Sequence, residues 1–475
     1  MADDLLKFVS IDQKTPAKRE PDTRRLDFDE IYAEFDPKAA EEQASRCSQC
    51  GVPFCHIHCP LGNNIPDWLK LTAEGRLEDA YEMASATNNM PEICGRICPQ
   101  DRLCEGSCVI EKDFESVTIG SVEKYIADTA WEQGWIKPIV PAVERPESIG
   151  IIGAGPAGLA AAEQMRMAGF QVHIYDRYDR AGGLLVYGIP GFKLEKDVVG
   201  RRTGRLEQSG ITFHLDFEVG RDETLSDLRD KHDALLIATG VYRSRSLKVP
   251  GVGLGNIREA LDYLVASNRK GFGDAVPEFD NGALDANGKN VVVIGGGDTA
   301  MDCVRTAVRQ GAKSVKCLYR RDRDNMPGSA REVKNAEEEG VEFVWLVSPE
   351  AFVGDKDISG VRAYQMRLGA PDSTGRQAPE PVPDSTFQLD CDLAITALGF
   401  EPEDLPALFG APELRVSRWG TVTVNHQSMM TNLNGVFAAG DIVRGASLVV
   451  WAIRDGRDAA SAMIKFLNEN ARAAA

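Results

Sequence analysis

Residues 148–176 read SIGIIGAGPAGLAAAEQMRMAGFQVHIYD, which predicts an apolar strand, a glycine-rich turn, a helix and a second strand. In such a turn Gly153 makes the tight bend, Gly155 lets the backbone approach a pyrophosphate, and Gly158 lets the helix pack closely on the strand. The phosphates would lie at the helix N-terminus, where unpaired N–H groups and the helix dipole favour anions. Asp176 follows the second strand and can accept hydrogen bonds from ribose hydroxyls, so we predict a dinucleotide-binding unit here.

The same order of elements returns in residues 290–320, NVVVIGGGDTAMDCVRTAVRQGAKSVKCLYR, where Gly295 and Gly297 form the turn. The second strand of this unit ends in Arg320 and Arg321 instead of an acid. An acid would repel a 2′-phosphate, whereas guanidinium groups pair with it. This second unit is therefore predicted to prefer NADPH to NADH.

Eight of the eleven cysteines precede both units, in the patterns C-x2-C-x4-C-x3-C and C-x3-C-x5-C-x3-C. Eight thiolates are the number that two 4Fe-4S clusters require, and cysteines in a large chain from a reducing compartment are better explained as metal ligands than as disulfides. Structural zinc is the alternative, but zinc sites commonly show two C-x2-C knuckles and this region has one. The predicted ligands are Cys47, Cys50, Cys55, Cys59, Cys94, Cys98, Cys104 and Cys108.

The division of these thiols between two clusters follows a rule known from two-cluster ferredoxins. There, a contiguous group gives three ligands to one cluster, and its last cysteine, followed by proline, joins the other cluster. Cys59 precedes Pro60. The predicted sets are Cys47, Cys50, Cys55 and Cys94 for one cluster, and Cys59, Cys98, Cys104 and Cys108 for the other. Cys94 and Cys108 could exchange, and Glu123 is a conceivable ligand that is not a cysteine.

The overall composition restricts the class of protein. A chain of 475 residues is too long for one core, so several domains are expected. Its net charge of −18 argues against nucleic acid as a partner. The N-terminus lacks the pattern of a signal peptide, and no stretch approaches the ~20 apolar residues of a membrane span. We therefore expect a cytoplasmic protein with no membrane partner.

Three further motifs carry a resemblance to a superfamily. Gly182-Gly183-Leu184, Ala238-Thr239-Gly240 and FAAGD at residues 437–441 resemble flavoproteins with two dinucleotide-binding domains. In that superfamily the first unit and the C-terminal GD motif hold FAD, and the inserted second unit holds NAD(P)H. The resemblance implies a discontinuous FAD domain. It also places FAD on Gly183, Leu184, Gly440 and Asp441.

The predicted fold class is α/β, with two Rossmann-like domains for FAD and NADPH behind a mainly helical domain that carries two 4Fe-4S clusters. Residues 36–46 and 65–85 are predicted helices of that first domain. The predicted domains are residues 1–145 (helical, iron–sulfur), 146–285 (FAD, first part), 286–400 (NADPH) and 401–475 (FAD, second part).

The predicted cofactors define an electron path. NADPH gives up two electrons as a hydride, a cluster accepts one at a time, and flavin converts between them. We expect the order NADPH, FAD, cluster, cluster, acceptor, with no catalytic side chain of the hydrolase type. The redox cysteine pair of disulfide reductases is missing, because Cys303, Cys317 and Cys391 are widely separated.

The strings GGLLVYGIPGFKLEKDVVGRR at 182–202 and NMPGSAREVKNAEEEGVEF at 325–343, together with both cysteine groups, resemble the small (beta) subunits of bacterial NADPH-dependent glutamate synthases. The resemblance extends from about Phe28 to the final helix. It implies a hetero-oligomer in which a large (alpha) subunit carrying FMN receives the electrons and makes glutamate from glutamine and 2-oxoglutarate. It also implies that Asp298 and Thr299 belong to the NADPH site.

Two other functions compete with this interpretation. The first is an electron-transfer subunit of an NAD(P)H-dependent dihydropyrimidine dehydrogenase or an NAD(P)H:ferredoxin oxidoreductase, which would share the cofactors. The second is a regulatory or scaffolding protein without redox turnover, against which the intact turns, arginines and cysteines argue.

Overall fold

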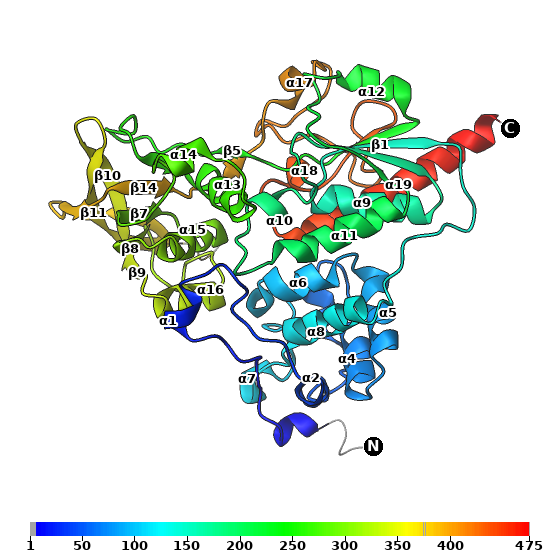
Figure 1. The fold of residues 1–475 in the computed structure, drawn as a ribbon, viewed down its shortest axis with the longest axis horizontal. Coiled ribbons are helices and arrows are strands. Elements are labelled where there is room, and N and C mark those ends of the chain that lie inside the picture. Colours follow the sequence, from blue (N-terminus) through cyan, green and yellow to red (C-terminus); the bar gives the residue numbers. More distant parts are fainter. Residues whose placement is uncertain (1–5, 374, 376, 475) are drawn as a thin grey trace.

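Three bodies make up the molecule in the computed structural model, which describes residues 6–373, 375 and 377–474. Figure 1 shows a helical body at the lower right, a sheet body above it, and a second sheet body at the left. Two separate parallel sheets behind a helical N-terminal part confirm the predicted α/β class. Within the described residues, no helix is both long and apolar enough to cross a membrane.

The helical body carries the eight clustered cysteines. Its main helices are α2 (Pro37–Ala44), α3 (Phe54–His58), α4 (Ile65–Ala73), α5 (Leu77–Thr87), α6 (Pro91–Ile97), α7 (Glu111–Phe114) and α8 (Ile119–Glu132). Proline lies in the first turn of α2, α4 and α6. Backbone N–H groups in the first turn make no hydrogen bond within the helix, so proline, which lacks this group, is tolerated there. Trp68 on α4 is fully buried in one apolar core with Ile126 of α8, which holds the helices together.

The helix predicted over residues 65–85 is two helices. α4 ends at Ala73 and α5 begins at Leu77, with Gly75 between them at a φ of +72°. That left-handed conformation ends a helix and suits glycine. The apolar periodicity of the sequence continues across this break because both helices pack on the same core, so periodicity alone did not reveal it.

The first parallel sheet has the strand order β16-β4-β1-β2-β3. Its strands are β1 (Ser148–Ile152), β2 (Gln171–Tyr175), β3 (Thr212–His214), β4 (Ala234–Ile237) and β16 (Val436–Ala438). Because β16 pairs with β4, with Val436 opposite Leu235, the C-terminal segment returns to this sheet and the domain is discontinuous.

Two long helices cover this sheet side by side (Figure 1), α9 (Pro156–Met167) and α19 (Val449–Ala474). Gly456 permits their close approach, since a Cβ there would lie 2.2 Å from the carbonyl oxygen of Ala157. The glycine turn after β1 is therefore braced by the end of the chain.

The second parallel sheet has the order β6-β14-β7-β8-β9. Its strands are β6 (Ile257–Glu259), β14 (Leu393–Thr396), β7 (Asn290–Ile294), β8 (Ser314–Tyr319) and β9 (Glu342–Trp345), with helices α13 (Ala260–Gly271), α15 (Asp298–Arg309) and α16 (Ala330–Glu338) packed around them. An antiparallel insertion follows β9, made of β10 (Val347–Gly354), β11 (Ile358–Pro371), β12 (Gln377–Pro381) and β13 (Phe387–Asp390).

The predicted boundary at residue 286 is too late, because β6 and α13 already belong to the second sheet body. Residues 272–289, rich in glycine and aspartate, contain α14 (Pro277–Asp280) and lie within that body, with Leu284 and Ala286 buried in its core. The two crossings between the sheet bodies pair as a short antiparallel ribbon, β5 (Arg243–Ser244) with β15 (Phe400–Glu401). The second body is thus inserted into the first through two adjacent strands.

The remaining elements complete the fold. They are the 3-10 helices η2 (Lys7–Val9) and η3 (Gln100–Arg102), and the helices α1 (Pro21–Arg24), α10 (Leu184–Tyr187), α11 (Lys196–Gln208), α12 (Leu225–Lys231), α14 (Pro277–Asp280), α17 (Leu405–Leu408) and α18 (Asp441–Arg444).

A buried ion network ties the N-terminal arm to the second sheet body. The Glu339 carboxylate accepts hydrogen bonds from Arg24 at 2.9 Å, Arg305 at 2.8 Å and Arg309 at 2.7 Å. Burial opposes ionisation of this group, but the guanidinium groups of Arg309 and Arg305 outweigh it and lower the pKa of Glu339 to about 2. The arm is therefore held by charges that stabilise it only while all of them stay paired.

We predict that Glu339→Gln lowers the free energy of unfolding at pH 7 by about 3 kcal/mol, because it leaves buried guanidinium groups without a counter-charge. Since the folded-state pKa lies below the ordinary 4.5, the stabilisation is present above that pH and is lost as the pH falls toward about 2. Urea unfolding at several pH values should show that the difference in free energy of unfolding between the wild type and the variant decreases as the pH falls. Glu342→Gln, which removes an exposed ion pair with Lys316, is the control and should change stability by less than about 1 kcal/mol. Equal losses in both variants would contradict the prediction.

Candidate cofactor sites

The turn after β1 has the geometry of a phosphate cradle. Gly153 has a φ of +112°, and a Cβ there would lie 2.4 Å from the carbonyl oxygen of Ala238. A Cβ on Gly158 would lie 2.0 Å from the carbonyl oxygen of Gly153, whereas one on Gly155 would meet nothing within 4 Å. The backbone is thus crowded on its inner side and open at the N-terminus of α9, where an anion would bind.

Two adjoining cavities, of about 620 and 530 Å³, extend from this turn. They share the wall residues Gly153, Asp176, Thr239 and Tyr242. The larger one is also lined by the predicted residues Gly155, Leu184, Gly440 and Asp441. One elongated cleft therefore brings the first unit together with the distant C-terminal motif.

Two polar groups of this cleft, Thr239 and Asp441, are removed from water. The hydroxyl oxygen of Thr239 is buried without a hydrogen bond. Burial raises the pKa of Asp441 to about 6, as expected for a carboxyl group removed from water. Gly183, at a φ of +54°, lies against Gly155, since its Cβ would be 3.0 Å from the Cα of that residue. A dinucleotide with ribityl and phosphate oxygens suits this combination of open backbone and unsatisfied polar atoms.

Asp176 has a structural role that was not predicted, beside its predicted contact with ribose hydroxyls. Its carboxylate accepts hydrogen bonds from the backbone N–H groups of Ala154 at 2.6 Å and Tyr178 at 2.9 Å, and burial raises its pKa. It therefore fixes the glycine turn, while it still lines both cavities.

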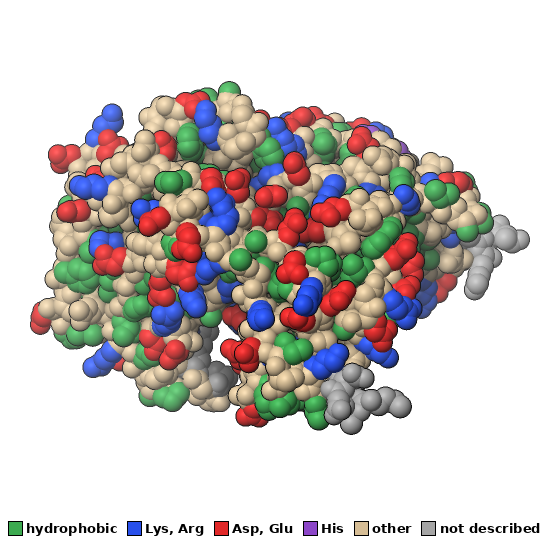
Figure 2. Space-filling model, turned by 60° about the horizontal axis from the view of Figure 1, so that its bottom comes forward, with side chains coloured by type: hydrophobic (Ala, Val, Ile, Leu, Met, Phe, Trp, Pro, Cys, Tyr) green, Lys and Arg blue, Asp and Glu red, His purple; other side chains and the backbone are tan. Residues whose placement is uncertain are grey.

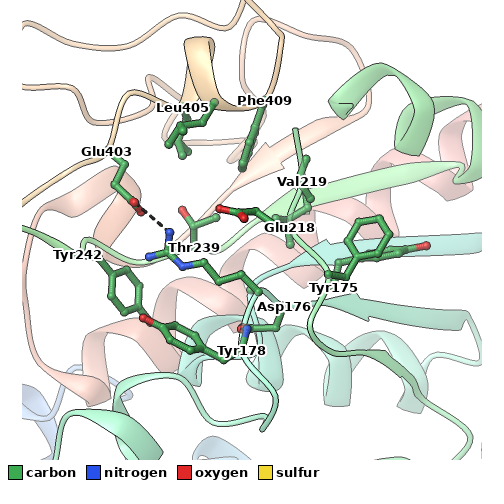
Figure 3. Close-up of a pocket in the computed structure, with 15 residues that line it drawn as sticks. Tyr175, Asp176, Tyr178, Glu218, Val219, Thr239, Tyr242, Glu403, Leu405 and Phe409 are labelled. Carbon is green, nitrogen blue, oxygen red and sulfur yellow. Dashed lines mark hydrogen bonds and ion pairs between the residues drawn. The ribbon is translucent and has the colours of Figure 1, made fainter. Parts of the chain in front are cut away.

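Sequence reasoning missed three residues of the second cavity. Arg177 donates to Glu403 at 2.9 Å and lies over the ring of Tyr242, 4.7 Å from its centre. Figure 3 shows Glu403 and Tyr242 on opposite sides of this arginine, with Tyr178 beside them. Arg177 directly follows Asp176, and Tyr242 lies two residues after the motif Ala238-Thr239-Gly240. Their positions beside predicted motifs could have identified both as residues of the site. Glu403 comes from another segment, so its position gave no such indication.

The turn after β7 repeats the cradle. Gly295 has a φ of +153°, and a Cβ there would lie 2.3 Å from the carbonyl oxygen of Ala397. A Cβ on Gly297, which precedes α15, would meet nothing within 4 Å. A cavity of about 1220 Å³ opens beside this turn. Its lining includes Gly295, Gly297, Arg320, Arg321, Arg245, Ser246 and Pro327.

Arginine side chains dominate the charge of this cavity. Arg320 and Arg321 line it as predicted, and the Nε atom of Arg321 is buried without a hydrogen-bond partner. Arg245, which follows the first crossing between the sheet bodies, was not predicted and adds a third guanidinium group. Asp298 and Thr299 lie in the first turn of α15 outside this lining, and Asp298 accepts the backbone N–H of Ser329 at 2.9 Å. The cavity suits a nucleotide that carries an additional phosphate.

We predict that Arg320→Ala combined with Arg321→Ala raises the Kd for NADPH at least about tenfold, because paired guanidinium–phosphate contacts are lost. Binding of NADH should change much less, since it has no 2′-phosphate. Fluorescence titration of the flavin-loaded chain with both coenzymes measures the two constants. Arg323→Ala is the control, because Arg323 pairs with Glu337 at 2.8 Å outside the cavity lining. Equal losses for NADPH and NADH would show that these arginines do not contact the 2′-phosphate.

The eight thiols form two groups of electrostatic neighbours. Burial raises the pKa of Cys55 to about 12, and the nearby thiols of Cys47, Cys108 and Cys50 add to this rise. Burial likewise raises the pKa of Cys59 to about 11, with Cys94 among the neighbours that contribute. Burial also raises the pKa of Cys104, and its neighbours include Cys59 and, with a smaller effect, Cys55. Cys98 lies within hydrogen-bonding distance of Cys94.

These neighbours favour the alternative in which Cys94 and Cys108 exchange places. The observed groups are Cys47, Cys50, Cys55 and Cys108, which we call the outer set, and Cys59, Cys94, Cys98 and Cys104, which we call the inner set. Cys94 and Cys98 are one helical turn apart at the end of α6, with the Cys98 N–H bonded to the Cys94 carbonyl at 3.1 Å, so both reach the same side. Cys108 follows a turn that returns the chain to Cys50. This grouping is the one obtained from the ferredoxin rule when Cys94 and Cys108 exchange places.

The chemistry of the donors suits iron–sulfur clusters. Buried thiols with a raised pKa become thiolates when a metal supplies compensating charge. In a cubane each thiolate binds a different iron atom, and two sets of four thiols supply the ligands of two such clusters.

Glu123 lies beside the inner set. Its carboxyl group accepts hydrogen bonds from Asn63 at 3.0 Å and Asn88 at 3.1 Å, and burial raises its pKa to about 8. The inner set already has four cysteines, so Glu123 is a polar neighbour with amide partners of its own.

We predict that Cys94→Ser and Cys59→Ser each abolish the same cluster, while Cys108→Ser abolishes the other one. Iron content together with low-temperature EPR of the reduced, anaerobically purified chain distinguishes the two signals. Cys391→Ser is the control, because this buried thiol lies in a core of the second sheet body. The grouping is wrong if Cys94→Ser removes the signal that Cys47→Ser removes.

The inner set faces the first sheet body. Cys94 belongs to the apolar core of that body, and Cys59 and Cys98 pack against it. Arg454 of α19 donates to the Pro60 carbonyl at 2.6 Å, which fixes the loop after Cys59. Arg102 donates to the carbonyl of Pro327, a wall residue of the arginine-rich cavity, at 2.6 Å. The loop between Cys98 and Cys104 thus also contacts the second sheet body.

Comparison with known proteins agrees with this division. Residues 24–135 match the family model described as dihydropyrimidine dehydrogenase domain II, 4Fe-4S cluster, and residues 147–456 match that of pyridine nucleotide-disulphide oxidoreductases. The chain is 65% identical over 470 residues to the glutamate synthase [NADPH] small chain of Azospirillum brasilense, covering 99% of this chain and 98% of the relative. Its identity to the Escherichia coli K12 protein of the same name is 43%, covering 98% and 100%.

Among solved structures, FprA from Mycobacterium tuberculosis in complex with NADPH has a similar fold. The match has a TM-score of 0.59 at 20% identity and covers 70% of this chain and 86% of FprA. It supports the arrangement of the two sheet bodies.

Proposed function

The chain belongs to the family of glutamate synthase [NADPH] small chains, and from this premise we propose that it is the NADPH-oxidising, electron-input subunit of a glutamate synthase. In this role it takes electrons from NADPH through FAD and two 4Fe-4S clusters to a large subunit. We further propose that the large subunit carries FMN and makes glutamate from glutamine and 2-oxoglutarate. The observation that carries the proposal is the packing of the inner set against the FAD-domain core.

When bound, FAD and the 4Fe-4S clusters would supply the conversion between the two-electron chemistry of NADPH and one-electron transfer. The protein contributes position and charge. Gly155 offers open backbone at the N-terminus of α9, and Thr239 and Asp441 present polar atoms to the same cleft. Arg320 and Arg321 would hold the 2′-phosphate of NADPH in the second cavity.

The cysteines divide the path into two steps. The inner set would hold the cluster next to the flavin, since Cys94 lies within the core of that domain. The outer set would hold the second cluster, because its four thiols do not belong to or pack against the FAD-domain core, whereas Cys59, Cys94 and Cys98 do. Electrons that leave the flavin would reach the outer set last.

A second candidate follows from the family model matched by residues 24–135, which is named after dihydropyrimidine dehydrogenase. A subunit of that kind would use the same cofactors and deliver electrons to a pyrimidine-reducing partner. The sites of this chain serve both functions, so the partner decides between them.

We predict that the isolated chain oxidises NADPH with ferricyanide as acceptor but forms no glutamate. Reconstitution with the large chain that accompanies it in a native, anaerobic purification should yield NADPH-dependent glutamate from glutamine and 2-oxoglutarate. The inactive control is the same mixture with the Arg320→Ala, Arg321→Ala chain at low NADPH. NADPH-dependent reduction of uracil or thymine by the purified pair, without glutamate formation, would establish the second candidate instead.

A further inference from the structure

The outer set lies at the end of the helical body away from the flavin cleft. α7, which begins three residues after Cys108, is at the lower edge of the molecule in Figure 1, opposite the first sheet body. If the inner set receives electrons from the flavin, the outer set is the place where they leave the chain. Electron transfer weakens steeply with distance, so an acceptor must approach the segments that surround these thiols.

Two such segments expose large apolar side chains. Residues 52–57 lie between Cys50 and Cys59, and residues 109–114 follow Cys108. Because the thiols of Cys50 and Cys108 are electrostatic neighbours, the two segments flank the same group of thiols. The exposed residues, which we call the outer patch, are Val52 (58% exposed), Phe54 (46%), Ile57 (57%), Val109 (52%) and Phe114 (41%).

Clustered apolar exposure of this kind marks an interaction surface more often than a solvated one. α3 places Phe54 and Ile57 one turn apart, three residues from each other, so both lie on one face. Phe114 is supported from behind by the ring of Phe8, with 4.9 Å between ring centres. The patch therefore consists of side chains held by a short helix and by a supported loop.

Acidic residues fringe the outer patch. Glu111, Asp113 and Glu115 are exposed beside Val109 and Phe114, with Lys112 among them. In Figure 2, which brings the lower end of the molecule forward, green hydrophobic and red acidic side chains lie next to one another near the lower edge. An apolar centre with an acidic rim fits a partner with an apolar centre and a basic rim.

We infer that the outer patch is the docking surface for the large, electron-accepting chain. The inference rests on the proposed function, and it adds the location of the interface: the partner covers the loops of the outer set with an apolar surface rimmed by Lys and Arg. Binding there would also exclude water from the segments around the last cluster. A second copy of this chain is a less suitable occupant, because two acidic rims would repel each other.

The test uses the full-length, cofactor-loaded chain and the large glutamate synthase chain of the same organism. Val52→Asp combined with Ile57→Asp places charge in the centre of the patch and should raise the Kd of the complex at least about tenfold. NADPH-dependent glutamate formation at limiting subunit concentration should fall accordingly. NADPH oxidation with ferricyanide, flavin content and both cluster EPR signals should stay at wild-type levels. Val140 is 88% exposed and lies in the segment between α8 and β1. Val140→Asp is the matched control, and this variant should bind the large chain as the wild type does.

A second variant tests the rim without touching the apolar centre. Asp113→Lys should slow association and weaken its dependence on ionic strength, because one attractive charge becomes repulsive. Glu207→Lys reverses an exposed charge on α11 and is the control. It should change neither the association rate nor its dependence on ionic strength. Association rates at two salt concentrations give the comparison.

The possible results separate the inference from its premise. If Val52→Asp, Ile57→Asp and Asp113→Lys all assemble and turn over like their controls while the wild-type pair makes glutamate, the docking surface is wrong and the proposed function stands. If the wild-type pair neither assembles nor makes glutamate, the proposed function fails. If the apolar variant abolishes self-association but leaves binding of the large chain unchanged, the patch joins two copies of this chain and the inference is overturned.

Discussion

The rest of the structure depends on one packing contact, in which the inner set of cysteines is built into the core of the first sheet body. Cys94 is buried in the same apolar core as Ile151 and Leu159, although these residues come from different bodies. A cluster held by Cys59, Cys94, Cys98 and Cys104 would therefore share a continuous interior with the flavin cleft. This shared core allows the helical body to act as part of the redox path rather than as an attached module.

The same loop also constrains the second sheet body. Arg102, between Cys98 and Cys104, contacts the wall of the arginine-rich cavity, and the network around Glu339 holds the N-terminal arm against α15 and α16. The chain crosses between the two sheet bodies at the paired strands β5 and β15. The two bodies also contact each other through ion pairs, Arg180 with Asp274 at 2.8 Å and Lys193 with Asp302 at 2.7 Å. The helical body therefore bridges both nucleotide domains, and it restrains the orientation that brings a nicotinamide to a flavin.

The sequence predicted the parts of the molecule whose chemistry is local. The glycine turns, the two arginines after β8 and the eight cysteines each act through neighbours close in the chain, so their residue types reveal them. The sequence left the places of Cys94 and Cys108 open, because they depend on how α6 directs two thiols to one side and on where the next turn returns the chain. The boundary at 286 was too late because β6 joins a sheet whose other strands lie after it. Arg245 and Glu403 were missed since only the fold brings them to the cavities.

The most direct test of the electron path is rapid-freeze EPR of the Cys59→Ser chain after anaerobic mixing with NADPH, with flavin absorbance followed in parallel. Cys59 belongs to the inner set, which packs on the FAD-domain core. The account predicts that the flavin is reduced at the wild-type rate while the remaining outer cluster stays oxidised on the timescale of turnover. Reduction of the outer cluster as fast as in the wild type would contradict it, because electrons would then reach that cluster without passing through the inner set.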